Sequence, residues 1–260
     1  ILAAGRGTRL EGMTEDQPKC FVTLGEMSLI ERQIATLTAA KINEIIIVTG
    51  YRADMLAFPG TKQVHNAKWA ATNMVESLFC AQSEFNDDFI VTYSDIVYEP
   101  RLIEALIKSP HDISVLINQQ WQDLWKTRFV NPLDDAESLR LDANNHIIEI
   151  GNAVEDINKI QGQFMGIVRF KGMGVHALRS AYINLGQIQR PWLKLRPLQK
   201  AYMTDLLMEL IETGHSVCAV PVEGGWLEID TVEDYKLMNA MFSDGSIDRF
   251  YNPQALDVSP

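Results

Sequence analysis

The sequence predicts an α/β fold in which a mainly parallel, mixed sheet is flanked by helices and carries an insertion of β-hairpins and helices. Through the first half of the chain, apolar runs rich in β-branched residues alternate with segments of helical periodicity. Strands linked by helices pair in parallel through right-handed crossovers. With 260 residues, 47% of them hydrophobic, the chain can bury a substantial core.

The individual elements follow from local signals. Residue 1 reads as the middle of a strand, and Ser28 with Glu31 forms a capping box that begins a helix. Buried strands are expected at 44–49, 88–94, 113–118 and 217–222. Helices are expected at 28–40, 73–81, 100–108, 175–185, 204–213 and 232–241. Shorter β-like pieces at 138–141, 147–150 and 164–170 suggest hairpins added to the edge of the main sheet.

The domain organisation expected from this pattern is simple. Residues 1–242 would form a single domain whose first strand is truncated at residue 1. Residues 243–260 show little periodicity and suggest a tail or linker.

Composition limits the partners. A net charge of −11 argues against nucleic acid, because phosphate backbones need a basic face, and any anionic ligand must meet a local cluster of cations. Three widely spaced cysteines suggest neither a disulfide framework nor a zinc site, which favours a reducing cytoplasm. The sequence has no apolar run of the roughly 20 residues that a transmembrane helix needs, so no membrane partner is expected.

The opening stretch, ILAAGRGTRL, places a glycine-rich loop directly after a strand. Gly5 and Gly7 let backbone N–H groups approach a ligand closely, and phosphate is the guest that such a loop favours. The dinucleotide fingerprint GxGxxG is not met, because its third position is Leu10. Arg9 and Lys19 add two cations that could reach phosphate oxygens, although a tight turn with two solvated cations remains an alternative.

Two strings, LAAGRGTRL and QPKCFVTLGEMSLIERQI, resemble the signature of the nucleotidyltransferase family that makes NDP-sugars and related activated metabolites. The resemblance implies a Rossmann-like, GT-A-like nucleotidyltransferase fold. It also implies that Arg9 and Lys19 hold the triphosphate and the leaving pyrophosphate. The loop residues that would wrap the nucleotide are Leu2, Ala3, Ala4, Gly5, Gly7 and Thr8.

Two aspartates are candidate metal ligands. Asp95 and Asp230 each follow a strand-like run, and ligands of open α/β sheets bind at the carboxyl ends of strands. Mg²⁺, which accompanies a nucleoside triphosphate, favours one or two carboxylates with phosphate oxygens and waters. The alternatives are a turn residue for Asp95 and a helix cap for Asp230. The family resemblance favours the metal role, since its metal-binding aspartates occur in matching places.

The segment HNAKWAATNMVESLFCA resembles the phosphocholine cytidylyltransferase branch and its relatives that activate aminoethylphosphonate. Asn73 and Ser77 match that branch and are candidates for nucleotide contacts. A helix cap for Asn73 and an exposed helix position for Ser77 are equally open.

A zwitterionic acceptor needs a cation site and an anion site. Trp125, which matches a tryptophan of the choline branch, could face an ammonium group, and Asp205 could pair with it. Lys126 and Arg128 could meet a phosphate or phosphonate. Each of these four residues has an alternative of equal weight. Trp125 could fill the core, Lys126 and Arg128 could be solvated charges, and Asp205 could lie in the first turn of a helix.

The sequence therefore predicts an Mg²⁺-dependent transfer of CMP from CTP to phosphocholine or 2-aminoethylphosphonate, with release of pyrophosphate. A sugar-1-phosphate nucleotidyltransferase using UTP, dTTP or GTP is the nearer alternative, and a non-catalytic nucleotide sensor is the more distant one. A homodimer or a fusion to another domain is also compatible with the chain.

Overall fold

The computed structural model describes residues 1–187 and 196–256, and the chain divides into two compact units. Unit 1 comprises Ile1–Ala70, Thr92–Ala105 and Gly224–Pro260, and unit 2 comprises Ala71–Val91 and Leu106–Glu223. The units alternate along the chain, with boundaries inside strand β6 (Asp88–Thr92) and helix α3 (Pro100–Lys108). Hydrophobic periodicity shows helices and strands but not which compact unit each one joins. The sequence therefore suggested a single domain over residues 1–242.

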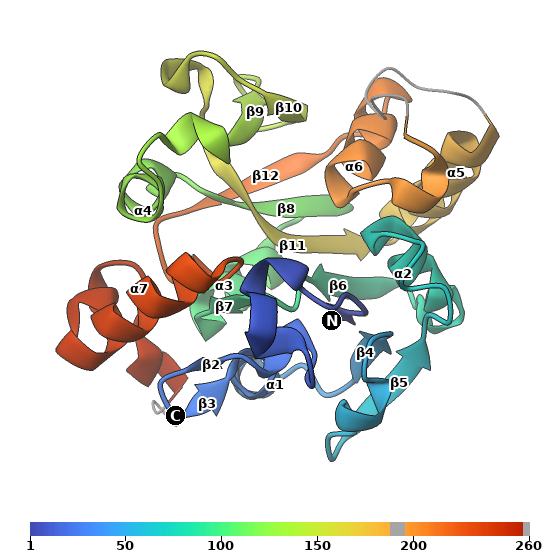
Figure 1. Cartoon of the computed structure of the whole chain (residues 1–260). Helices are drawn as coiled ribbons and strands as arrows, with labels where there is room; N and C mark the ends of the chain where they lie inside the picture. The colour runs from blue at the N-terminus through green and yellow to red at the C-terminus, as the bar shows by residue number, and fades with distance from the viewer. Residues whose placement is uncertain (188–195, 257–260) are drawn as a thin grey trace. The chain divides into compact units, whose positions relative to one another are not determined.

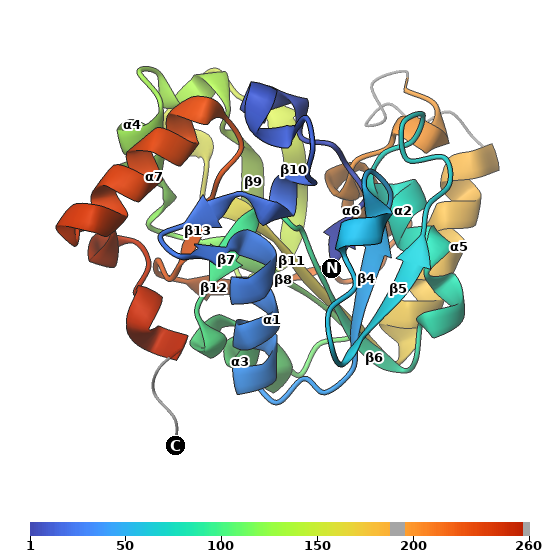
Figure 2. The same ribbon diagram turned by 60° about the horizontal axis from the view of Figure 1, so that its bottom comes forward.

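Unit 1 is built on three parallel strands in the order β1–β4–β5 (Figures 1 and 2). The strands are β1 (Leu2–Ala3), β4 (Ile45–Thr49) and β5 (Thr61–His65). Leu2 pairs with Val48 on one side and forms a parallel bridge to Tyr93 on the other. The glycine loop therefore leaves the sheet from an interior strand, with β4 on one flank and the chain that leads to Asp95 on the other.

The two main helices of unit 1 begin at capping boxes. Helix α1 (Leu29–Ala39) starts at Ser28 with Glu31, and α7 (Val232–Asp244) starts at Thr231 with Asp234. These observations confirm the helices predicted from 28 and from 232. Buried polar side chains of α1 also bond to carbonyls of strand β7 (Ile96–Tyr98): Gln33 Nε2 donates to Ile96 O at 2.8 Å, and Thr36 Oγ1 to Tyr98 O at 3.0 Å.

Two further strand pairs complete unit 1. Strand β13 (Trp226–Glu228) pairs antiparallel with β7, and β2 (Thr23–Leu24) forms a hairpin with β3 (Met27–Ser28). The β13–β7 pair joins segments more than 120 residues apart in the sequence. Asp95 directly precedes β7, and Asp230 lies two residues after the end of β13.

The segment expected to be a tail packs onto unit 1 as far as the structure describes it. Helix α7 continues to Asp244, and Ile247, Phe250 and Tyr251 are buried. The carbonyl of Phe250 accepts hydrogen bonds from Gly225 N (2.6 Å) and Trp226 N (3.2 Å). This packing differs from the predicted tail or linker for residues 245–256, whereas residues 257–260 lie outside the described part.

Unit 2 contains a four-stranded sheet in the order β12–β8–β11–β6 (Figure 1). Strand β8 (Ile113–Asn118) pairs parallel with β12 (Cys218–Val222) and antiparallel with β11 (Gln163–Lys171). The sequence placed 164–170 in an edge hairpin, but β11 lies inside the sheet. Its run of buried residues from 165 to 170 is typical of an interior strand.

Among its described residues, unit 2 also contains a hairpin and four α-helices. The hairpin strands are β9 (Glu137–Leu141) and β10 (Ile147–Ala153). The helices are α2 (Met74–Cys80), α4 (Trp121–Arg128), α5 (Met173–Gln187) and α6 (Met203–Glu212). Helix α4 was not predicted, although its buried residues Trp121, Leu124 and Trp125 have the i, i+3, i+4 spacing of an amphipathic helix.

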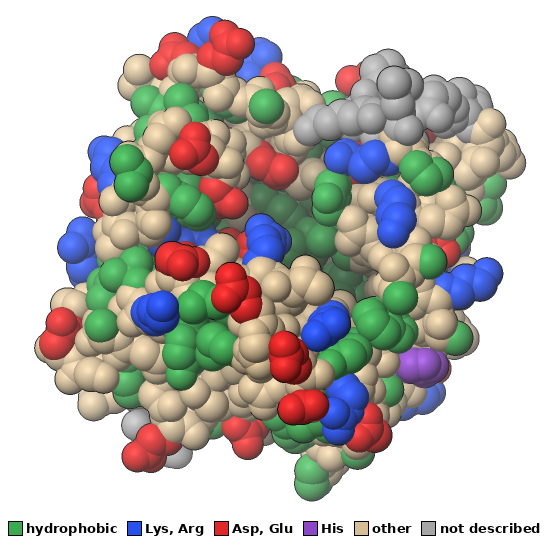
Figure 3. Space-filling model, viewed as in Figure 1, with side chains coloured by type: hydrophobic (Ala, Val, Ile, Leu, Met, Phe, Trp, Pro, Cys, Tyr) green, Lys and Arg blue, Asp and Glu red, His purple; other side chains and the backbone are tan. Residues whose placement is uncertain are grey.

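The surface carries both signs of charge. Acidic and basic side chains are interspersed over the face shown in Figure 3. Within the part of the chain that the structure describes, no helix combines the length and the apolar character needed to cross a bilayer.

Candidate functional site

The glycine loop after β1 is shaped by two glycines that have different surroundings. Gly7 has a φ of 76°, and a Cβ there would lie 2.6 Å from Cβ of Lys19, so the lysine stem packs directly against the loop. Around Gly5, by contrast, a Cβ would meet nothing within 4 Å. Thr14 Oγ1 donates to Gly7 O at 3.0 Å and closes the loop. The loop therefore leaves space beside Gly5 and uses Gly7 to admit the lysine.

Four charged side chains predicted from the sequence meet beside this loop. Lys19 Nζ donates to Asp95 Oδ2 at 2.7 Å and also to Asp230 Oδ1. Arg9 Nη1 forms an ion pair with Asp230 Oδ2. The Lys19 side chain is 9% exposed, whereas that of Arg9 is 67% exposed. Lys19 is thus a fixed bridge between the two carboxylates, and Arg9 is a solvated cation able to move to a ligand.

The β7–β13 pair brings the two aspartates together. Asp95 directly precedes β7, and Asp230 follows β13, whose Glu228 is opposite Ile96 in the register. Ile229 N donates to Asp95 O at 2.9 Å, which joins the two strand ends. The α7 cap then fixes the second aspartate, because Asp234 Oδ2 accepts from Asp230 N at 3.1 Å.

The charge of Lys19 is determined by this environment. Burial by itself would lower the pKa of Lys19, but attraction to Asp95, Asp230 and Glu228 outweighs burial and raises it above its ordinary value of 10.5. The ammonium group therefore stays protonated at neutral pH. Glu228 was not singled out from the sequence, although it lies two residues before Asp230 in the string LEID.

The donor set of this cluster fits Mg²⁺. Asp95 Oδ1 is buried and has no hydrogen-bond donor among the described residues, so one carboxylate oxygen remains available for a metal. No group of three His, Cys, Asp or Glu side chains able to hold a metal occurs in that part of the chain. Mg²⁺ commonly uses only one or two carboxylates and takes its other ligands from phosphates and water. Asp95 and Asp230 are the residues that would hold it.

Asn73 and Ser77 lie in unit 2, on helix α2. Asn73 caps the helix, since its Oδ1 accepts from Met74 N at 2.9 Å, and its backbone N donates to Gln199 O at 2.7 Å. Ser77 is buried, not exposed as the alternative reading expected, and its Oγ donates to Asn73 O at 3.3 Å. Both residues therefore have structural roles, and their contact with a nucleotide remains a prediction.

Trp125 is 3% exposed and packs edge-to-face on Trp121, with ring centroids 5.8 Å apart. The guanidinium of Arg128 lies over the Trp125 ring at 5.3 Å, so a cation of the protein itself already covers that ring. Lys126 is exposed on the same helix. Trp125 therefore has a packing role, and the predicted contacts of Trp125, Lys126 and Arg128 with an acceptor remain predictions.

Asp205, on helix α6, is 4% exposed and its carboxylate is already engaged. Arg196 Nη2 donates to Asp205 Oδ1 at 2.9 Å and to Oδ2 at 3.1 Å, and Tyr202 N donates to Oδ2 at 2.8 Å. An arginine of the protein thus already pairs with this carboxylate, and the predicted contact of Asp205 with an acceptor remains a prediction. Arg196 was missed in the sequence, because an arginine in an irregular segment gives no periodic signal.

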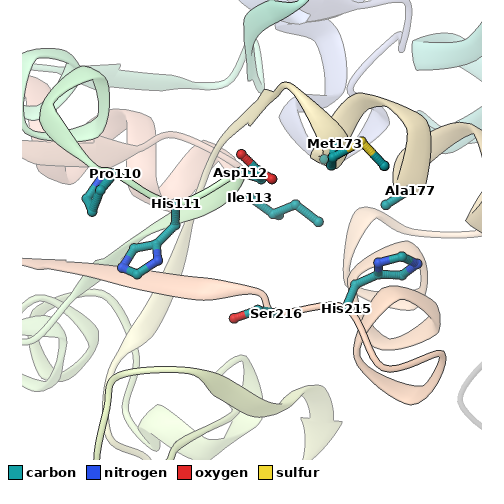
Figure 4. A pocket seen from close by; sticks show the side chains of 9 residues that line it. Pro110, His111, Asp112, Ile113, Met173, Ala177, His215 and Ser216 are labelled. Atoms are coloured by element: carbon teal, nitrogen blue, oxygen red, sulfur yellow. The ribbon is translucent and has the colours of Figure 1, made fainter.

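A cavity of about 340 Å³ lies elsewhere in unit 2. Figure 4 shows His111, Asp112, His215 and Ser216 around it, together with the apolar side chains of Met173 and Ala177. Its lining contains none of the residues predicted to bind nucleotide, metal or acceptor. The candidate chemistry therefore rests on the charged cluster of unit 1 and not on this cavity.

Comparison with known proteins places these features in a family. The chain is 35% identical over 249 residues to CTP:phosphoglutamine cytidylyltransferase of Campylobacter jejuni, which covers 91% of this chain and 97% of that protein. It is 34% identical over 115 residues to choline-phosphate cytidylyltransferase of Streptococcus pneumoniae, which covers 43% of this chain and 50% of that protein.

Solved structures show the same fold. The CTP:phosphocholine cytidylyltransferase LicC of Streptococcus pneumoniae matches 93% of this chain and 96% of its own, with a TM-score of 0.67 and 22% identity. A putative glucose-1-phosphate thymidylyltransferase of Bacillus anthracis matches 99% and 97%, with a TM-score of 0.71 and 17% identity. These likenesses confirm the predicted α/β nucleotidyltransferase fold.

The model of the family described as "MobA-like NTP transferase domain" matches residues 1–144, which is more than half of the chain. The match begins with the glycine loop and includes Lys19 and Asp95. Together with the full-length similarity to a cytidylyltransferase, it shows that the chain is an enzyme of the nucleotidyltransferase type and belongs to the MobA-like NTP transferase family.

Proposed function

We propose that the protein is a cytidylyltransferase that joins CMP from CTP to the phosphate group of a small acceptor and releases pyrophosphate, with Mg²⁺ as its cofactor. The observation that carries the proposal is the cluster of Arg9, Lys19, Asp95 and Asp230 beside the glycine loop. CTP is favoured because two relatives, at 35% and 34% identity, are both named as cytidylyltransferases.

Two cations of the chain, Lys19 and Arg9, assist the transfer. An oxygen of the acceptor phosphate attacks the α-phosphorus of CTP, the bond from that phosphorus to the bridging oxygen breaks, and pyrophosphate leaves with the electron pair. The attacking oxygen is already anionic at neutral pH, so no general base is required. Lys19, held in place by two carboxylates, supplies a preorganised positive charge as negative charge develops. Arg9 can exchange its contact with Asp230 for a phosphate.

Mg²⁺, bound by Asp95 and Asp230, would neutralise phosphate charge and orient the triphosphate. The acceptor class follows from the named relatives, which act on phosphoglutamine and choline phosphate. A small phosphorylated amino compound is therefore the proposed acceptor, and 2-aminoethylphosphonate remains in the same class.

The test is a matrix of four nucleoside triphosphates against phosphoglutamine, phosphocholine, 2-aminoethylphosphonate and glucose 1-phosphate. Pyrophosphate release is measured, and ³¹P NMR identifies the nucleotide-linked product. CTP with an amino acceptor should give the highest kcat/KM. A preference for UTP or dTTP with glucose 1-phosphate would replace the proposal with the sugar-nucleotide alternative, and nucleotide binding without any product would support a sensor.

Variants of the aspartates test the metal role. Asp95→Asn and Asp230→Asn should fold normally and lose orders of magnitude in kcat, because each removes a charged ligand of the cofactor. Asp54→Asn is the matched control, since Asp54 is an exposed carboxylate that pairs with Arg52. Near-normal turnover at saturating Mg²⁺ in either cluster variant would remove that residue from the metal site.

A further inference from the structure

The carboxylate of Asp205 in unit 2 is engaged by hydrogen-bond donors of the protein. Both Asp205 oxygens accept from Arg196 Nη2, and Oδ2 also accepts from Tyr202 N, so the carboxylate is neutralised and almost fully buried. Because both oxygens of this carboxylate already accept hydrogen bonds from the protein, an ammonium group would have to displace those donors.

The guanidinium group of Arg196 has an N–H donor that no described residue of the protein uses. Its guanidinium lies over the Tyr202 ring at 4.5 Å from the centroid, which fixes the plane of the group. Its Nε is buried and has no hydrogen-bond acceptor among the described residues. A buried N–H group without an acceptor is costly, and a ligand oxygen can remove that cost. The Arg196 side chain as a whole is 26% exposed, so a ligand can reach it.

The chain around Arg196 is anchored to the residue predicted to contact nucleotide. Gln199 O accepts from Asn73 N at 2.7 Å, and Lys200 O accepts from Asn73 Nδ2 at 3.3 Å. The segment that begins at Arg196 is therefore hydrogen-bonded to Asn73, the N-cap residue of helix α2. Arg196 is held from both directions, by Asp205 through its side chain and by Asn73 through the backbone that follows.

We propose that Arg196 binds a carboxylate of the acceptor and that Asp205 is the positioning residue that holds Arg196. This inference rests on the proposed function and narrows it: the acceptor carries a carboxylate in addition to its reacting phosphate, as a phosphorylated amino acid does. A planar guanidinium with fixed orientation suits a carboxylate, whose two oxygens match its N–H groups. Phosphocholine has no carboxylate and therefore lacks the group that Arg196 would bind in addition to the reacting phosphate.

The experiment compares two acceptors that differ only in the carboxylate: phosphoglutamine and its analogue in which hydrogen replaces the α-carboxylate. Arg196→Gln should raise KM for phosphoglutamine by roughly 10- to 100-fold, the range for a lost charge-assisted hydrogen bond. KM for the decarboxylated analogue and for CTP should change by less than about twofold, because neither uses the missing group.

Further variants separate positioning from binding. Arg196→Lys should recover part of the loss, since it keeps the charge and loses the planar fork. Asp205→Asn should raise KM for phosphoglutamine while leaving that for the analogue unchanged. The matched control is Arg179→Gln, because Arg179 is another stacked arginine of unit 2, 5.3 Å from the Phe85 ring, and donates to Gln82 O. Its KM values should match those of the wild type.

Three results would overturn the inference. Equal increases in KM for both acceptors in Arg196→Gln would show that Arg196 has a structural role. A lower unfolding temperature of Arg196→Gln with unchanged KM values would show the same. A wild-type enzyme that prefers phosphocholine over phosphoglutamine would exclude the carboxylate while leaving cytidylyl transfer intact. Absence of pyrophosphate release with every acceptor would instead contradict the proposed function itself.

Discussion

At the scale of single residues, the ammonium group of Lys19 lies between two carboxylates and cannot reorient without breaking an ion pair. Lys19→Ala should lower kcat by roughly 10²- to 10³-fold, the scale for loss of one preorganised electrostatic donor. Steady-state kinetics at saturating CTP and acceptor measure this loss. A rise in KM for CTP with kcat unchanged would show that Lys19 contributes to ground-state binding alone.

The raised pKa of Lys19 adds a dependence on pH. Since its folded-state pKa lies above the ordinary 10.5, the stabilisation from the ion pairs is fully present below that value. It is lost only as the pH rises through the raised pKa. The pH profile of kcat should therefore show no descending limb from Lys19 below pH 10.5, and Lys19→Ala should leave the neutral region of the profile unchanged in shape.

Arg9 pairs with Oδ2 of Asp230, one of the two carboxylates that would hold the metal. Arg9→Gln should therefore raise the affinity for Mn²⁺ without nucleotide, by up to about fivefold, because exposed ion pairs contribute up to about 1 kcal/mol. Arg6→Gln is the control, since Arg6 is in the same loop but stacks on Tyr51 at 5.4 Å. Calorimetric titration with Mn²⁺ compares the three proteins. Equal affinities in Arg9→Gln and Arg6→Gln would show that only net charge matters.

At the scale of elements, the cap of α7 links stability to the site. Thr231 Oγ1 accepts from Asp234 N at 3.0 Å, and Asp234 in turn holds the backbone of Asp230. Thr231→Ala should lower the free energy of unfolding by about 0.5–2 kcal/mol, the usual cost of a lost N-cap. Thr38→Ala, which removes an exposed hydroxyl inside α1, should be close to neutral. Urea unfolding of both variants tests this, and equal costs would contradict the capping argument.

The sequence predicted the helices and strands that depend on neighbouring residues alone. The capping box at Ser28 and the β-branched run of β4 were predicted and appear in the structure. The cap of α7 is Thr231 and not Asp230, which was the alternative role offered for that aspartate. Strands β7 and β13 have three residues each, too few for a periodic pattern, and their pairing is a tertiary event. The sequence therefore placed Asp95 and Asp230 each after a strand without showing what joins them.

Burial was the other quantity that the sequence could not supply. Trp125 and Asp205 have the chemistry to bind an ammonium group, and the sequence assigned them to it. The structure buries both and gives each a partner arginine, Arg128 or Arg196. Residue type fixes what a side chain can do, whereas packing decides which atoms remain available to a ligand.

At the scale of the whole molecule, the predicted chemistry divides between the two units. Arg9, Lys19, Asp95 and Asp230 all belong to unit 1, and the candidate acceptor residues belong to unit 2. Each unit is assembled from separate stretches of chain, so the residues of one function are scattered along the sequence. Asp230 lies beyond residue 144, where the family match ends.

The cysteines give a whole-molecule test of the fold. Burial raises the pKa of the Cys20 thiol to about 12 and also raises that of Cys218, so both stay protonated and shielded from a thiol reagent. Cys80 is exposed. Titration with a disulfide reagent at pH 8 should modify one thiol in the native protein and all three in denaturant. Rapid modification of more than one native thiol would contradict this core.

The two loop glycines would respond differently in a saturation-mutagenesis screen that scores cellular abundance and product formation separately. Replacing Gly7 collides with Lys19, so its variants should lose abundance and activity together. Gly5 has room for a methyl group in the protein alone, so Gly5→Ala should keep full abundance. If Gly5→Ala lost activity, the added methyl group would have to collide with the bound substrate. The screen would therefore show whether the nucleotide contacts the backbone at Gly5.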